Sequence, residues 1–380
     1  MIYLDNAATS FPKPEVVYEA ILNHMKNFGA NPGRSGHKMA LKAGYEIYKG
    51  REIIAELFNI EDPMQIIFTS NATEALNLAI KGILKPGDHV ITTSMEHNSV
   101  LRPIKALEKN GVENTIVKSN INGCLNPKDI KNHIKENTKL IVMTHASNVT
   151  GSLMPIKEVG KIARKKGLIF LVDAAQTAGA YHIDVKNMNI DLLAMAGHKG
   201  LMGPQGTGVL YIKEGIEVQP LKEGGTGSKS QELIQPLTLP DRYESGTHNT
   251  PGIVGLTKGV EYILKEGIDK IREQEEFLTG YFLDGLRKIE KVKIYGPQDI
   301  KKQAAVVSIN IGEEDSSEIA YILDNAFDIA VRPGLHCAPL AHKTIGTLEQ
   351  GTIRFSMGYF NTKKDIELAL IAIKEICKEI

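Results

Sequence analysis

The sequence predicts an α/β protein with a large domain, built on a mostly parallel sheet covered by helices, and a smaller α/β domain at the C-terminal end. Strand and helix patterns alternate from residue 65 to residue 199, which is typical of a parallel sheet with helices on both faces. The strand patterns are short and continuously apolar, as expected for strands buried on both sides. From about residue 252 the pattern shifts to a long amphipathic helical region followed by further strands, which indicates the second domain.

The composition is ordinary for a globular protein, with 380 residues, 42% of them hydrophobic and 24% charged, and this length is enough for two domains. Lys and Arg together number 45, as do Asp and Glu, so no basic excess favours nucleic acid or an anionic membrane as a partner. We see no signal peptide and no apolar run near the roughly 20 residues of a membrane span. Cys124, Cys337 and Cys377 are too few and too scattered for a disulfide framework or a zinc site. We therefore expect a cytoplasmic protein without a metal ion.

The individual elements follow from helix and turn signals between the apolar runs. Prolines at positions 12 and 14 start a helix that reaches about residue 27, and a loop rich in Pro and Gly follows over residues 31–37. We expect strands over residues 65–69, 89–93, 140–143, 167–172 and 192–195, and in the second domain over 292–295, 305–309 and 351–356. We expect further helices over residues 38–58, from about 74, over 317–324 and over 363–379, and a loop over 224–240.

The most unusual stretch is residues 191–200, a short buried strand that runs into a polar turn containing His198 and Lys199. A glycine-rich segment follows, and it cannot continue as a helix. A lysine held near a desolvated site loses basicity and becomes a nucleophile that can form a Schiff base with an aldehyde. The alternative is a solvated lysine at a strand end, which is the commoner situation for this residue type.

A carboxylate in a second stretch favours the chemical interpretation. Residues 167–172 form an apolar run that ends in Asp173, which places this carboxylate at the carboxyl end of a buried strand. Ligands of open α/β sheets bind at that edge. An acid there, together with Lys199, suits pyridoxal phosphate (PLP), which needs a lysine for its aldehyde and an acid that keeps its pyridine nitrogen protonated.

The order of the polar motifs resembles a known family, the cysteine desulfurases and selenocysteine lyases of the class V aminotransferase group of fold type I PLP-dependent enzymes. The resemblance extends from residue 3 to Arg354 and is carried by Thr73, His97, Asp173 with Gln176, His198 with Lys199, Gly246 with Thr247, and the late segment 332–337. It implies a large PLP-binding domain over residues 15–250 with a seven-stranded sheet. It also implies a small domain, made of residues 1–14 and 251–380, that carries Cys337 and Arg354.

The resemblance also implies roles for particular residues. The residues expected to hold PLP are Ala72, Thr73, His97, Asn148, Asp173, Gln176, His198, Lys199 and Thr247. Thr247 would reach the phosphate of the other subunit, which implies a homodimer with shared active sites. Thr73 lies at a helix start, where free N–H groups suit a phosphate, although the same signal also fits a plain capped helix. Ala196 occupies a position where the family often has Ser, so one phosphate donor is missing.

Substrate contacts are expected from Asn148, Arg354, Arg332, His37 and Arg34. Arg354 lies in a strand pattern, where a buried guanidinium needs an anion such as an amino-acid carboxylate. The alternative for Arg354 is an internal ion pair with an acid of the protein, and for His37 and Arg34 it is a loop surface position.

Cys337 lies in a loop rich in Gly and Pro, next to His336 and near Arg332, so we expect it to be accessible. Cationic neighbours stabilise the thiolate, which is the nucleophilic form. The alternative for a free cysteine is a buried small hydrophobic residue. The short sequence separation between Cys337 and Arg354 resembles that of the desulfurases with a compact cysteine loop.

The sequence therefore predicts a PLP-dependent enzyme with Lys199, Cys337 and His97 as catalytic residues. Sulfur of L-cysteine would pass to Cys337 as a persulfide, L-alanine would be released, and the sulfur would then go to an acceptor protein or a small thiol. L-Selenocysteine remains open as the substrate, as does another aminotransferase or lyase reaction on a small amino acid. A protein of this fold that binds without turnover is a further alternative. A dinucleotide-binding dehydrogenase is disfavoured because no strand leads into a G-x-G-x-x-G turn.

Overall fold

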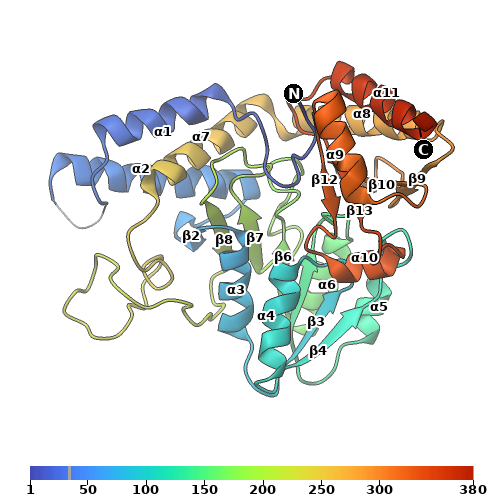
Figure 1. Ribbon diagram of the computed structural model, residues 1–380. Helices are drawn as coiled ribbons and strands as arrows, with labels where there is room; N and C mark the ends of the chain where they lie inside the picture. Colours follow the sequence, from blue (N-terminus) through green and yellow to red (C-terminus); the bar gives the residue numbers. More distant parts are fainter. Residues whose placement is uncertain (33–35, 380) are drawn as a thin grey trace.

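The computed structural model describes residues 1–32 and 36–379, which form two main sheets with helices packed on them (Figure 1). The substrate contact expected of Arg34 therefore lies outside the described residues.

The larger sheet has seven strands in the order β2-β8-β7-β6-β5-β3-β4. Strands β4, β3, β5, β6 and β7 are mutually parallel, whereas β8 runs antiparallel to both of its neighbours. The sequence correctly predicted a mostly parallel sheet. The strands are β2 (Ile66–Thr69), β3 (His89–Thr93), β4 (Glu113–Val117), β5 (Thr138–Thr144), β6 (Ile169–Asp173), β7 (Leu192–Ala196) and β8 (Gly208–Ile212).

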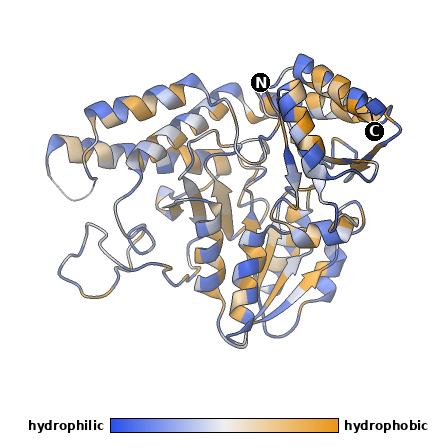
Figure 2. Ribbon diagram, viewed as in Figure 1, coloured by the Kyte–Doolittle hydropathy of each residue, from blue (hydrophilic) through white to orange (hydrophobic). Residues whose placement is uncertain are grey.

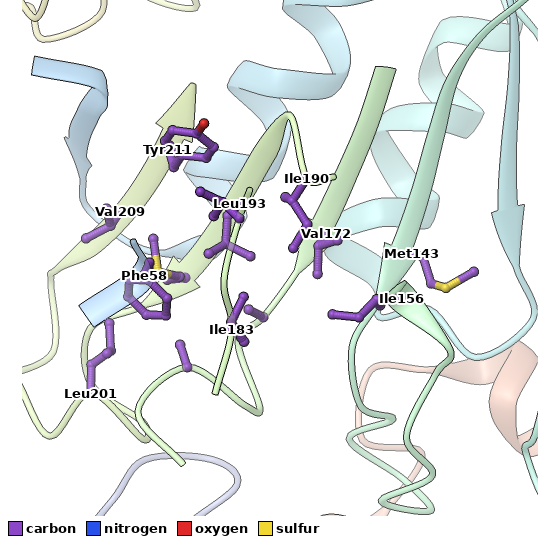
Figure 3. Packing of buried hydrophobic residues seen from close by; sticks show 14 of the residues in the cluster. Phe58, Met143, Ile156, Val172, Ile183, Ile190, Leu193, Leu201, Val209 and Tyr211 are labelled. Atoms are coloured by element: carbon purple, nitrogen blue, oxygen red, sulfur yellow. The ribbon is translucent and has the colours of Figure 1, made fainter. Parts of the chain in front are cut away.

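Both faces of this sheet are buried, because successive side chains of a strand point to opposite sides. In β7, Leu193 and Met195 belong to one hydrophobic cluster, and Leu192 and Ala194 to another on the opposite face. Figure 3 shows the first cluster, in which Leu193 lies near side chains from neighbouring strands and from the helix that ends at Phe58. This double burial explains the continuously apolar strand sequences.

The helices of the larger part cover these two faces. Residues of α3 (Ala72–Ile83) and α4 (Asn98–Glu108) complete one cluster. The other cluster contains residues of α2 (Lys38–Phe58), α5 (Pro127–Asn132), α6 (Ile156–Lys166) and α7 (Thr250–Glu266). Helix α1 (Glu15–Asn27) packs against α7, and a 3₁₀ turn (Pro63–Gln65) precedes β2. Figure 2 shows the alternation of hydrophilic and hydrophobic residues along these helices.

The smaller part has an antiparallel sheet of four strands in the order β12-β13-β10-β9. The strands are β9 (Val292–Tyr295), β10 (Val306–Ile311), β12 (Arg332–Gly334) and β13 (Thr352–Ser356). Helices α8 (Ile268–Leu286), α9 (Ser316–Phe327) and α11 (Lys363–Glu379) share a separate hydrophobic cluster with this sheet. The N-terminal β1 (Ile2–Tyr3) pairs in parallel with β11 (Ile329–Ala330), which attaches the N-terminal segment to the smaller part.

Three features differ from the expected elements. The helical region expected over residues 252–289 is two helices, because Gly267 adopts φ +86° between α7 and α8. Strands β4 and β8 had not been predicted; β4 is a partly exposed edge strand, and β8 follows the glycine-rich segment. A short helix, α10 (Pro339–Ile345), follows the cysteine loop.

Within the described ranges, no helix combines the length and the apolar character that crossing a bilayer requires.

Candidate active site

A cavity of about 220 Å³ lies where β5, β6 and β7 end. The strand register brings Thr144 of β5 beside Asp173 of β6, and Asp173 beside Ala194 of β7. Since these strands are parallel, the segments that follow them meet at one edge of the sheet. Among the residues predicted from sequence, those that line the cavity are Ala72, Thr73, His97, Asn148, Asp173, Gln176, His198 and Lys199.

Asp173 is buried at the end of β6, with 4% of its surface exposed. Its carboxylate accepts the N–H of Ala175 at 2.9 Å. Burial raises the pKa of this carboxyl, and the Ala175 hydrogen bond and the Lys199 charge oppose that rise. Asp173 is therefore a proton acceptor of raised basicity, which suits a partner that arrives with a positively charged N–H.

Lys199 lies in the turn after β7, and its backbone carbonyl accepts the Ser10 hydroxyl at 2.8 Å. Burial lowers the pKa of its amine to about 8, with the positive charge of Arg354 as the next cause, while Asp173 opposes the shift. A pKa near 8 leaves about a tenth of the amine neutral and nucleophilic at pH 7, far more than for an ordinary lysine. The alternative of a fully solvated lysine is not observed, since Lys199 is partly buried and lines the cavity.

His97 caps the N-terminus of α4, where its Nδ1 accepts the N–H of Ser99 at 3.1 Å. Burial lowers the pKa of the ring to about 4, and the nearby charges of Lys199 and Arg332 lower it further. The ring is therefore neutral at pH 7. Because Nδ1 acts as an acceptor, the single proton resides on Nε2.

The N-terminus of α3 forms another wall of the cavity. Asn71 caps this helix by accepting the N–H of Glu74, so the plain helix cap considered from sequence is present. The cap leaves the N–H groups of Ala72 and Thr73 without a partner among the described residues. The Thr73 hydroxyl lies 2.7 Å from that of Ser99. Free N–H groups at a helix start form a ready anion site.

Two further polar side chains complete the wall. Gln176 lines the cavity and donates to the carbonyl of Ala7 at 3.1 Å. His198 has a buried Nδ1 that lacks a hydrogen-bond partner among the described residues. Burial lowers the pKa of His198 to about 4, so its ring is neutral. Ala196 also lines the cavity, and its methyl side chain offers no hydroxyl donor at the position where a serine was expected from the resemblance.

The cysteine loop is fixed to the cavity wall from two sides. The Asn148 amide donates to the carbonyl of His336 at 2.7 Å, and the N–H of Asn98 donates to the carbonyl of Cys337 at 2.8 Å. His336 and Cys337 adopt φ values of +48° and +58°, a left-handed conformation that is strained in residues other than Gly. Strain of this kind is commonly found at functional loops.

Cys337 is exposed, so the alternative of a buried small hydrophobic residue is excluded, whereas Cys377 is buried. Arg332 Nη2 lies 3.9 Å from the sulfur of Cys337. Arg332 and Cys337 are not among the residues that line the cavity.

Arg354 is 1% exposed in β13 and pairs with Asp5, with Nη2 and Oδ1 2.7 Å apart. Its Nη1 donates to the carbonyl of Asn148 at 3.0 Å, and its Nε is buried without a partner in the described part of the chain. The internal ion pair weighed from sequence is therefore present, and its acid is at the other end of the chain. A substrate contact by Arg354 remains a prediction.

Two predicted residues lie away from the cavity. His37 is exposed and caps α2, accepting the N–H of Ala40 at 3.3 Å. Thr247 is exposed and lines a separate hollow of about 180 Å³. The contact of His37 with substrate and that of Thr247 with the phosphate of a partner subunit remain predictions.

Glu96 and Asp5 are buried or partly buried charged residues that the sequence did not point to. Glu96 lies beside His97, is fully buried, and accepts the N–H of Thr144 at 2.9 Å. Burial raises the pKa of Glu96 to about 8. The sequence signal that could have pointed to Glu96 is the presence of a carboxylate shortly after the strand over residues 89–93.

Comparison with known proteins assigns the chain to a family. The family model described as Aminotransferase class-V matches residues 2–369. The chain belongs to the class-V aminotransferase family. Within this family, it is 38% identical to a probable cysteine desulfurase of Pyrococcus abyssi, over 100% of this chain and 95% of that relative. It is 35% identical to the cysteine desulfurase IscS of Clostridium botulinum, over 100% of this chain and 94% of that relative.

Solved structures of this family have the same fold. The apo structure of a cysteine desulfurase from Thermococcus onnurineus superposes with a TM-score of 0.94 at 37% identity, covering 100% of this chain and 95% of that one. The cysteine desulfurase CsdA of Escherichia coli superposes with a TM-score of 0.90 at 27% identity, with the same coverage. The predicted family and fold class are thus confirmed.

Proposed function

We propose that this protein is a PLP-dependent cysteine desulfurase that converts L-cysteine to L-alanine and transfers the sulfur to Cys337. The observation that carries the proposal is the meeting of Lys199, Asp173 and His97 around one cavity, with the exposed Cys337 on a loop bound to its wall. The cysteine desulfurase relatives support this choice among the activities of the family.

The residues around the cavity fit PLP. Lys199 would bind its aldehyde, Asp173 would accept the ring N–H, and the neutral ring of His97 would lie against the pyridine. Ala72, Thr73 and His198 would hold the phosphate, and the unpartnered Nδ1 of His198 supports an anion or acceptor at that place. Gln176 and Asn148 would approach the ring hydroxyl. When bound, PLP supplies an electron-withdrawing ring that acidifies the Cα hydrogen of an amino acid.

Lys199 would act as the base at Cα, because an amine with a pKa near 8 can take up and return a proton at neutral pH. Arg354, with Asn148 beside it, would bind the α-carboxylate of the substrate. Arg332 would stabilise the thiolate of Cys337, since its guanidinium contacts the sulfur.

Cys337 would complete the reaction as the nucleophile. Its thiolate attacks the substrate sulfur, a sulfur–sulfur bond forms, and the carbon–sulfur bond of L-cysteine breaks. The products are L-alanine and a Cys337 persulfide anion, so atoms and charge balance without an added oxidant. A thiol or an acceptor protein then takes the terminal sulfur. We expect this chemistry in the cytoplasm, where the three free cysteines stay reduced.

We also propose a homodimer in which Thr247 of one subunit reaches the phosphate site of the other. Large apolar side chains that are exposed in a single chain support it; examples are Leu22, Met25, Leu41 and Tyr45 on α1 and α2. Thr247 itself is exposed and available to a partner. Sedimentation equilibrium should give twice the chain mass, and a monomer that retains full activity would refute the shared site.

The domain division proposed is 15–250 for the large domain and 1–14 with 251–380 for the small one. Leu4 supports it, because this N-terminal residue packs in the cluster of the smaller part. Helix α7 instead packs with the larger sheet, so packing alone would place the boundary near Gly267.

The direct test incubates the purified holoenzyme with L-cysteine and a thiol reductant and measures alanine and sulfide. We expect equal amounts of both. Cys337→Ala should retain the visible absorbance of PLP and lose L-cysteine turnover, while the matched control Cys124→Ala should keep turnover. Full turnover by Cys337→Ala would refute the nucleophile, and turnover of L-selenocysteine alone would favour the selenocysteine lyase alternative.

A further inference from the structure

The N-terminal segment, residues 5–13, lies against the candidate active site with one side and is exposed at residues 11 and 12. The carbonyl of His198 accepts the N–H of Ser10 at 3.1 Å and the amine of Lys13 at 2.7 Å. The carbonyl of Ala7 accepts a hydrogen bond from the Gln176 amide, and the N–H of Ala7 donates to the Ser356 hydroxyl at 2.8 Å. These bonds fix the segment on one side to the turn that contains His198 and Lys199, and on the other side to β13.

Asp5 at the start of this segment is the acid that pairs with Arg354. The Arg354 side chain is 1% exposed and that of Asp5 is 19% exposed, so water screens this pair only weakly. The carbonyl of Asn148 holds Nη1 of the same guanidinium from the other side. The orientation of Arg354 therefore does not depend on the Asp5 charge alone.

The Arg354 guanidinium keeps one N–H group that is not used within the described part of the chain. It carries five N–H groups in a planar fork, and Nε has no partner among the described residues. Arg332, directly across the strand pair from Arg354, has no carboxylate within ion-pair distance in the described ranges. The region thus combines two arginines with one resident carboxylate, that of Asp5.

We propose that Asp5 is the resident counter-ion of Arg354 and a positioning residue that determines how strongly the site binds the α-carboxylate of an amino acid. This inference rests on the proposed function, in which Arg354 binds that carboxylate. Asp5 partly neutralises the guanidinium and repels a second carboxylate, so it weakens binding of the incoming acid. Removing its charge while keeping its shape should therefore tighten carboxylate binding and leave binding of a simple amine unchanged.

The test compares wild-type and Asp5→Asn holoenzymes by visible-spectrum titration with two amines. L-Alanine carries the α-carboxylate, and ethylamine lacks it. We expect the Kd of L-alanine to fall by about three- to tenfold in Asp5→Asn, as the loss of one close opposing charge predicts, with the Kd of ethylamine changing less than about twofold. Asp365→Asn is the matched control, because Asp365 accepts the N–H of Thr362 in the same part of the protein and forms no ion pair with Arg354. It should change neither constant.

An unchanged or weaker affinity for L-alanine in Asp5→Asn would overturn the inference, as would an equal gain for ethylamine. If Asp5→Asn does not fold or retain PLP, Asp5→Ala with added formate replaces it. Formate should bind in the vacated place and weaken L-alanine binding towards the wild-type value, and the absence of a formate effect would overturn the inference. Failure of the proposed function is distinguishable, because wild-type enzyme would then release no alanine from L-cysteine whatever the titrations give.

Discussion

A buried ion pair between Arg51 of α2 and Glu244 provides a quantitative stability test. Arg51 Nη1 and Glu244 Oε1 are 2.8 Å apart, and the two side chains are 4% and 1% exposed. Glu244 also accepts the N–H of Phe68 at 2.6 Å. The substitution Arg51→Met leaves this carboxylate buried without the guanidinium, although His248 Nε2 still lies 3.4 Å from it. Removing one partner of a buried ion pair typically costs about 3–5 kcal/mol of unfolding free energy.

The double variant Arg51→Met with Glu244→Met removes both charges. It leaves the Phe68 N–H without its acceptor and the Ile66 carbonyl without the Arg51 donor. Each loss costs about 1–3 kcal/mol, and the added apolar burial offsets part of it. We therefore expect the double variant to be more stable than Arg51→Met alone. The measurement is urea unfolding of the apoprotein by circular dichroism at one fixed protein concentration. An Arg51→Met variant within about 1 kcal/mol of wild type, or a double variant less stable than either single one, would refute the reasoning.

The remaining predictions concern pH and the cysteine loop. Because the pKa of Lys199 is lowered to about 8, the rate at which apoprotein takes up PLP should rise with pH and level off above about 8; a rate still rising at pH 10 would indicate an ordinary lysine. Glu96 has a pKa raised to about 8, so the folded state binds its proton more tightly than the unfolded state, and stability from this group is lost as pH rises from about 4.5 to 8. Urea unfolding should show that Glu96→Gln weakens this pH dependence, by up to about 1.4 kcal/mol per pH unit, and an unchanged slope would contradict the assignment. Asn148→Ala removes the amide that holds the His336 carbonyl, so alkylation of Cys337 by iodoacetamide should change rate in the apoprotein, whereas an unchanged rate would mean that the loop does not depend on this bond.

The parts of the site that sequence could predict are those set by local pattern. Asp173 and Lys199 each follow a short apolar run, and a parallel sheet brings such strand ends together at one edge. Their convergence on one cavity follows from the predicted fold class. Thr73 was found in the same way, because the helix-start signal is local.

The contacts that sequence could not predict join distant segments. Asp5 and Arg354 are at opposite ends of the chain, and no periodic pattern relates them. Gln176 donates to the carbonyl of Ala7, and this bond depends on how the N-terminal segment crosses the turn that contains Lys199. Glu96 is a different case, because a carboxylate shortly after a strand is a local signal, whereas its burial and its bond to the Thr144 N–H depend on the neighbouring strand.

The break at Gly267 shows how a single residue limits a pattern-based prediction. The amphipathic pattern continues across it, yet its backbone is left-handed there and the two helices on either side belong to different hydrophobic clusters for most of their length. A glycine inside a helical pattern is compatible with a continuous helix as well as with a break, and only tertiary packing decides between them.

The central claim, that Lys199 is the residue that binds PLP, has one direct measurement. Sodium borohydride reduces the lysine–PLP bond of the holoenzyme and so makes it permanent. Peptide mass spectrometry then locates the adduct. We predict a single adduct on the peptide that contains Lys199. An adduct on another lysine, or a PLP-loaded protein that yields none, would contradict it.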